Sequence, residues 1–187
     1  GATRLGRPVK IVLSRPEDLR STGKRHPYSS DYRLGLSRDG RLLAYEVVFY
    51  QNAGASSDLS PAILERTLFH CTGSYFVPNV RATAYSCRTN LPPNTAFRGF
   101  GGPQAMFVLE AALERAAAAL GVPAWRLQEK NLLRDGDVFP YGTVARECQA
   151  RRCWQEAKAL LTLEEAWRRV ERYNRGHTLS KKGLALM

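Results

Sequence analysis

The sequence lacks an apolar run long enough to cross a membrane, and it has little that could bind a metal on its own. A membrane-spanning helix needs roughly 18 consecutive apolar residues, and no stretch of the 187 residues reaches that length. The 4 cysteines include no Cys-x-x-Cys pair, and the 3 histidines lie far apart. We therefore expect neither a zinc site nor an iron–sulfur cluster built within this chain.

Two further absences bear on location. The first residues, Gly1 to Arg4, have no apolar run behind their positive charge, so no signal peptide is expected. Sparse cysteine without paired spacing is typical of reduced thiols in the cytosol. A cytoplasmic protein without membrane contact is the prediction.

Acidic residues are also in short supply. Lys and Arg number 28 against 17 Asp and Glu, which gives a net charge of +11. The basic residues are scattered, with no run longer than two, whereas a nucleic-acid binder more often gathers them on one helix or around stacking aromatics. We therefore do not expect nucleic acid as a partner, although a basic, non-catalytic binding domain stays open as an alternative.

The first half of the chain has the patterns of strands with one longer helix. Asp39-Gly40 between two alternating runs is the strongest short hairpin signal. The order that we predict is a strand at 8–13, a helix starting at 14–18, hairpin strands at 32–37 and 41–50, a loop at 52–57, a helix at 60–70 and a strand at 80–87.

The second half has helical periodicity. Residues 89–103 form a connection rich in Pro, Asn and Gly, and Pro103 suits the first position of the helix that follows. That helix, expected to end at Gly121, has its apolar residues at three- and four-residue steps: Met106, Leu109, Leu113, Ala116 and Leu120. Further helices are predicted at 123–133, 152–160 and 163–173, and the last residues, 183–187, have a strand-like pattern. Antiparallel strands with a hairpin in the first half and helices in the second indicate the α+β class.

One segment carries chemistry. In residues 94–104, NTAFRGFGGPQ, three glycines in four positions let a backbone approach a ligand closely, and the turn leads into a helix N-terminus that suits anionic groups. Arg98 adds a fixed cation, and Phe100 offers a flat apolar face. The segment fits neither the phosphate-loop nor the dinucleotide pattern. From residue types alone, a plain helix entry with a structural Arg and a core Phe remains open.

The run NTAFRGFGGPQAM resembles the signature of the molybdenum-cofactor subunit of the xanthine dehydrogenase and aldehyde oxidase family. The resemblance covers nearly the whole chain, in the same order. Its other blocks are TGKRHPY (22–28), YQNAGASSDLS (50–60), ILERTLFH (63–70), YFVPNVRATAYSCRTNLPP (75–93), KNLLRDGD (130–137) and RCW (152–154).

This resemblance implies that residues 1–187 are a partial molybdopterin-binding domain within a larger fold. Residues 1–90 would be mainly strands with one helix, and residues 91–187 a cofactor loop followed by helices. It also implies a molybdenum–molybdopterin cofactor, with FAD and 2Fe–2S clusters on other domains or subunits. The expected partners are the rest of the molybdopterin domain, those FAD and Fe–S parts, and a purine substrate.

The resemblance assigns roles to five residues. Arg98 matches an arginine beside the molybdenum, near the metal but not a ligand, and Gly99 and Gly101 belong to the same cofactor loop. Phe100 matches one of two phenylalanines that sandwich the substrate, and Arg66 an arginine that faces a purine. Related aldehyde oxidases generally lack that arginine, so Arg66 favours hypoxanthine or xanthine over an aldehyde or another aromatic heterocycle.

Other parts of the family's site are not in this chain. The resemblance puts the catalytic glutamate in a later segment, beyond Met187, and a second substrate-facing glutamate before Gly1. No catalytic residue is assigned here, and the chain alone is expected to be inactive. Residues 138–151, with Cys148, depart from the family pattern and receive no function.

Overall fold

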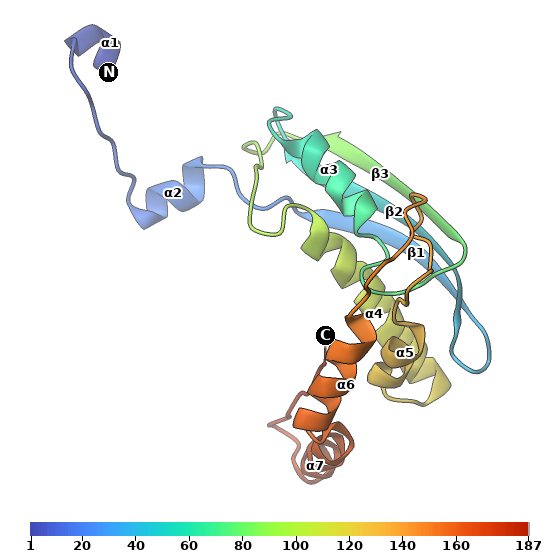
Figure 1. The fold of residues 1–187 in the computed structure, drawn as a ribbon. Coiled ribbons are helices and arrows are strands. Elements are labelled where there is room, and N and C mark those ends of the chain that lie inside the picture. Colours follow the sequence, from blue (N-terminus) through green and yellow to red (C-terminus); the bar gives the residue numbers. More distant parts are fainter. Residues whose placement is uncertain (187) are drawn as a thin grey trace.

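The computed structural model describes residues 1–186 and has a three-stranded sheet with helices (Figure 1). The α+β class is therefore confirmed. The elements are α1 (Ala2–Leu5), α2 (Arg15–Ser21), β1 (Tyr28–Leu36), β2 (Leu42–Gly54), α3 (Ser60–Phe69), β3 (Val80–Arg88), α4 (Gly102–Leu120), α5 (Ala124–Asn131), α6 (Ala150–Leu160) and α7 (Leu163–Gly176).

The sheet has the order β1-β2-β3, with β2 in the centre. β1 and β2 form the antiparallel hairpin expected around Asp39-Gly40, and both strands are longer than predicted. β3 pairs with β2 in parallel, so the sheet is mixed rather than antiparallel throughout. The parallel direction follows from the crossover through α3, which returns the chain to the start of the sheet before β3 begins.

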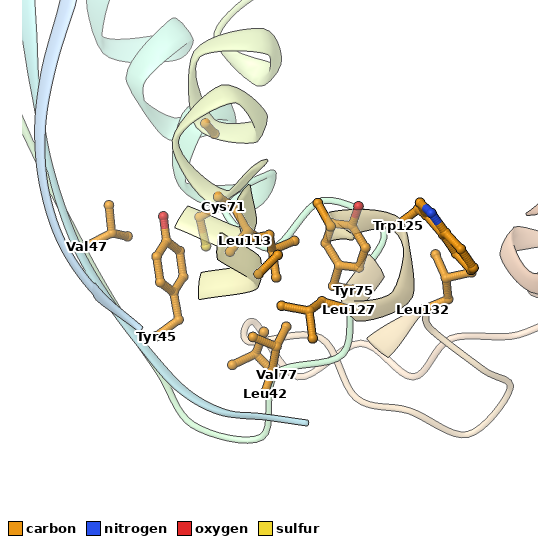
Figure 2. Close-up of a cluster of buried hydrophobic side chains, with 14 of the residues drawn as sticks. Leu42, Tyr45, Val47, Cys71, Tyr75, Val77, Leu113, Trp125, Leu127 and Leu132 are labelled. Carbon is orange, nitrogen blue, oxygen red and sulfur yellow. The ribbon is translucent and has the colours of Figure 1, made fainter. Parts of the chain in front are cut away.

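One face of the sheet is covered by α3 and α4 (Figure 1). Along β2, alternate residues point to that face and are buried: Tyr45, Val47, Phe49 and Gln51. Figure 2 shows Tyr45 and Val47 pointing from the strand toward Leu113 of α4 and Cys71. This alternation is the reason that the strand has one register against the helices.

The buried face of α4 differs from the predicted one. Leu109 and Leu113 are buried as expected, but Met106 and Leu120 are exposed, and the remaining core positions are alanines: Ala105, Ala112 and Ala117. Small side chains at these positions let the helix lie close to the sheet. The helix ends at Gly121, whose φ of 68° is left-handed, as predicted.

The predicted strand at residues 8–13 is wrong. This segment has no regular structure and belongs to an N-terminal arm that extends away from the sheet (Figure 1). Ile11 and Val12 are 84% and 76% exposed. A strand needs a neighbour to pair its backbone groups, and none of the described residues pairs with this segment. Residues 183–186 likewise form no strand, and Met187 lies outside the described residues.

Candidate cofactor and substrate site

The site loop, residues 94–101, has an unusual backbone. Gly99, Phe100 and Gly101 all have positive φ, at 89°, 47° and 95°. For Phe100 this conformation is strained, and such strain concentrates at functional sites. The loop folds on itself, because the Phe100 N–H donates to the Phe97 carbonyl (2.9 Å) and the Gly102 N–H to the Gly99 carbonyl (3.0 Å). Those two N–H groups are therefore not among the outward donors that the sequence suggested.

Gly101 packs against α3. A Cβ at this position would lie 2.7 Å from the Thr67 hydroxyl oxygen and would collide with the Ile63 carbonyl oxygen. The sequence suggested that this glycine allows close approach to a ligand. In the structure the close approach is to a neighbouring helix, and it fixes where α4 begins.

A chain of hydrogen bonds, half-buried at the sheet and buried at α3, links the sheet to the site loop. Ser86 of β3 donates to the Gln51 side-chain oxygen (2.9 Å), and the Gln51 amide donates to the Tyr28 hydroxyl oxygen (2.9 Å). Tyr28 and Thr67 are hydrogen-bonded at 2.9 Å. Because the Thr67 hydroxyl faces the carbonyl oxygens of Ile63 (3.0 Å) and Gly101 (3.3 Å), it must donate to them, so Tyr28 donates to Thr67. The loop thus has a fixed, fully paired base.

Arg25 holds the loop from the other side, a role that the sequence reasoning missed. Its Nη2 donates to the Arg98 carbonyl oxygen at 2.6 Å, and its guanidinium lies 4.5 Å from the centre of the Phe97 ring. The block TGKRHPY contained Arg25, but only the fold brings residues 73 positions apart together. Lys24, which precedes Arg25, adds a further link, because its carbonyl accepts a hydrogen bond from the Thr95 N–H (3.0 Å).

His26 joins the same segment to the start of α3. It is buried, and its Nε2 lies 2.7 Å from the Ser60 hydroxyl oxygen. Burial lowers the pKa of His26, because the charged ring would lose its hydration, and the nearby Asp58 carboxylate opposes that shift. The pKa of Asp58 is itself lowered, chiefly by a hydrogen bond from Thr95.

The structure brings the two predicted substrate residues together. The Arg66 guanidinium carbon lies 6.0 Å from the centre of the Phe100 ring. Arg66 is exposed on α3, and Phe100 is half-buried on the site loop. A cation therefore stands beside an aromatic face, an arrangement that can hold a flat ring and stabilise negative charge on it.

The predicted cofactor residues lie next to this pair. Arg98 and Gly99 are exposed, whereas Gly101 is buried beneath them. Within residues 1–186, no group of three His, Cys, Asp or Glu side chains is placed to hold a metal ion. The loop instead presents a guanidinium and accessible backbone, which suit the anionic and hydrogen-bonding groups of an organic cofactor rather than direct metal ligation.

The structure also bears on two expectations from composition, membrane crossing and the distribution of basic residues. No described helix has both the length and the apolar character that a membrane crossing requires. The basic residues are not scattered evenly in space, because six of them line one hollow beside α5 and α6. They are Arg41, Arg126, Lys130, Arg134, Arg151 and Lys158, and two glutamates lie among them. This hollow is away from the site loop.

Sequence comparison identifies the same family. Residues 1–132 match the family model of the molybdopterin cofactor-binding domain. Xanthine dehydrogenase/oxidase of Mus musculus is 40% identical over 186 residues, which are 100% of this chain and 14% of that protein. Xanthine dehydrogenase of Oryza sativa subsp. japonica is 39% identical over 98% of this chain and 13% of its own length. The chain therefore spans about one seventh of these relatives.

Solved structures share the fold. The aldehyde oxidoreductase of Desulfovibrio desulfuricans superposes with a TM-score of 0.83 at 26% identity, over 91% of this chain and 19% of that chain. Quinoline 2-oxidoreductase of Pseudomonas putida, at 22% identity, shows the fold alone, with a TM-score of 0.80 over 93% of this chain and 23% of that chain. The chain belongs to the molybdopterin cofactor-binding domain family, among the proteins related to xanthine dehydrogenases and aldehyde oxidoreductases.

Proposed function

We propose that this chain is part of a molybdenum hydroxylase that oxidises purines such as hypoxanthine and xanthine, and that it supplies part of the cofactor and substrate pocket. The observation that carries the proposal is the placement of the Arg66 guanidinium 6.0 Å from the Phe100 ring. The names of two relatives, both xanthine dehydrogenases, support the same substrate class.

The physical reason is charge. When an oxygen atom is added to a purine ring carbon, negative charge builds on the ring nitrogens and carbonyl oxygen. A guanidinium facing the ring stabilises that state more than the ground state, and Phe100 holds the ring flat while it reacts. An aldehyde keeps its charge on its own carbonyl and depends less on a cation at this distance.

Arg98, Gly99 and Gly101 are the residues that would hold molybdopterin. Arg98 offers donors to anionic groups, Gly99 offers accessible backbone, and Gly101 fixes the loop against α3. The bound molybdenum centre supplies the oxidation–reduction chemistry. FAD and 2Fe–2S groups, the catalytic base and the remaining cofactor-binding loops would come from other parts of a cytoplasmic enzyme. We therefore expect the 187-residue chain alone to be inactive.

The cofactor role is tested by Arg98→Ala in the complete protein. Molybdenum content per protein should fall severalfold, because the loop loses its cation for the cofactor. Arg151→Met, an exposed arginine on α6, is the matched control and should keep full molybdenum. Equal molybdenum and equal turnover in Arg98→Ala and wild type would refute the assignment.

The substrate is tested by Arg66→Met in the complete protein. The kcat/KM for hypoxanthine should fall by roughly two to three powers of ten, the usual scale for one lost electrostatic donor. For benzaldehyde it should fall much less. Measuring both substrates on one preparation controls for cofactor loss. Equal losses would make Arg66 structural and count against the purine assignment.

An aldehyde oxidase is the second candidate, because a solved structure that this fold resembles is an aldehyde oxidoreductase. The same two-substrate measurement separates the candidates. An enzyme that oxidises benzaldehyde well and hypoxanthine poorly, before any substitution, would support this alternative.

A further inference from the structure

A groove of about 460 Å³ lies between β1, an edge strand of the described sheet, and the first half of α4. Its lining is mixed, with Tyr28, Ser30 and Tyr32 from the strand and Pro103, Gln104 and Phe107 from the helix. Phe107 is 73% exposed. Phe107 thus offers apolar area that a segment bound in the groove would cover.

The register of the hairpin leaves backbone groups unpaired along this groove. The Asn52 N–H donates to the Pro27 carbonyl (3.0 Å), which makes that pair a hydrogen-bonded one. In an antiparallel ladder such pairs alternate with non-hydrogen-bonded ones. Ser30 and Tyr32, paired with Phe49 and Val47, fall in the second kind. Their N–H and C=O groups therefore point away from β2, toward a free edge of the described sheet.

Three side-chain atoms at the groove also lack partners. Arg25 Nη1, Ser30 Oγ and Gln104 Oε1 are shielded from water and make no hydrogen bond within residues 1–186. The Gln104 amide is oriented by its Nε2, which donates to the His26 carbonyl (3.3 Å), so its oxygen is the free acceptor. The chain's own residues already enclose these three atoms, so the backbone edge of β1 is the part of the groove that a partner can bond.

We propose that this groove binds an extended main-chain segment from the part of the protein outside residues 1–187, which adds a strand to the free edge of β1. The inference rests on the proposed function only in treating the chain as part of a longer enzyme. The relatives are about seven times longer, since this chain covers 14% of their length, so most of the polypeptide lies outside the described residues.

The chemistry of the groove fits a polypeptide backbone. A strand offers alternating N–H and C=O groups at the spacing that Ser30 and Tyr32 present. Apolar side chains on one face of that strand cover Phe107, which is exposed beside the groove. Arg25 lines the same groove and donates to the Arg98 carbonyl, so the added strand lies beside the residue that holds the site loop.

Photo-crosslinking of the complete protein tests the occupant. A benzophenone side chain replaces Phe107, and a second preparation carries it at Leu120, exposed at the other end of α4. After irradiation, the label at 107 should crosslink to one peptide outside residues 1–187, and the label at 120 should not reach that peptide. Crosslinks confined to residues 1–187, crosslinks to the N-terminal arm of a second copy, or no crosslink at all would each overturn the proposal.

Hydrogen exchange tests the edge pairing itself. In the complete protein, Ser30→Pro removes an outward N–H without removing a bond to β2, and it should speed amide exchange of the peptide covering residues 31–34 about fivefold, the effect of roughly one lost hydrogen bond. Ser180→Pro, in an exposed segment after α7, is the matched control. Wild-type exchange in Ser30→Pro would contradict the strand addition. Molybdenum content and hypoxanthine oxidation of the same samples report separately on the proposed function, so the two can fail independently.

Discussion

Two glycine-containing loops of this molecule have similar backbone angles and opposite surroundings. In the site loop, Gly101 has φ 95° and its backbone lies against Ile63 and Thr67 of α3. In the loop of residues 134–147, Gly136 has φ 88°, and a Cβ there would meet nothing within 4 Å.

The two loops are also held differently. Residues 134–147 are closed by their own backbone: the Gly136 N–H donates to the Ala145 carbonyl (3.0 Å), and Ala145 donates to the Asp137 carbonyl (2.8 Å). The site loop has backbone bonds of its own, from Phe100 and Gly102, but it is also held by Arg25 and Thr67, which lie in other segments. A positive φ alone therefore marks a turn, whereas a positive φ with packed backbone marks a loop whose position the rest of the fold determines.

The largest contrast is expected from Gly101→Ala and Gly136→Ala in the complete protein. Each substitution should lower the free energy of unfolding by roughly 1–2 kcal/mol, because it places a side chain in the left-handed region. Gly101→Ala also forces backbone apart at α3, so its total destabilisation should reach about 3 kcal/mol or more, with loss of molybdenum. Thermal unfolding and metal analysis measure both. Similar losses in the two variants would erase the distinction between the loops.

A smaller contrast is expected from Thr67→Val and Thr143→Val. Thr67→Val leaves the Tyr28 hydroxyl without its acceptor, which should cost about 1–3 kcal/mol. Thr143 is exposed, and its change should stay within about 0.5 kcal/mol. Combining Thr67→Val with Tyr28→Phe should cost less than the sum of the single changes. Additive losses would mean that the hydrogen-bond chain does not connect the sheet with the loop.

The smallest effect concerns pH. Burial lowers the pKa of His26 below its unfolded value of about 6.5, despite the opposing charge of Asp58. Below that pH the unfolded chain binds a proton that the folded chain takes up less readily. Stability should therefore decrease as pH falls through about 6.5 toward the folded pKa. Urea unfolding at pH 7.5 and 5.5 measures the decrease, which His26→Gln should reduce. An unchanged decrease in that variant would assign it to another group.

Much of the local structure followed from the sequence. The Asp39-Gly40 hairpin, the helices from α2 onward and the Gly121 stop were predictable because turn residues and periodicity act within a few positions. The short helix α1 was not predicted. The resemblance also indicated the family, which the family model confirms. The strand at 8–13 was not predictable in this way, because alternation describes a strand only when an edge is available to pair with it.

The sequence by itself determined which residues could form the site; the tertiary structure decided how they are held. Arg66 and Phe100 were assigned from motifs, but their 6.0 Å separation depends on α3 packing against the site loop through Gly101. Arg25 and Thr67 lie in blocks that resemble the family, but nothing in those blocks indicated a role for them, and their bonds to the loop join residues 73 and 34 positions apart. Such long-range pairs form only when the sheet brings the segments together, and for this reason no local pattern could have predicted them.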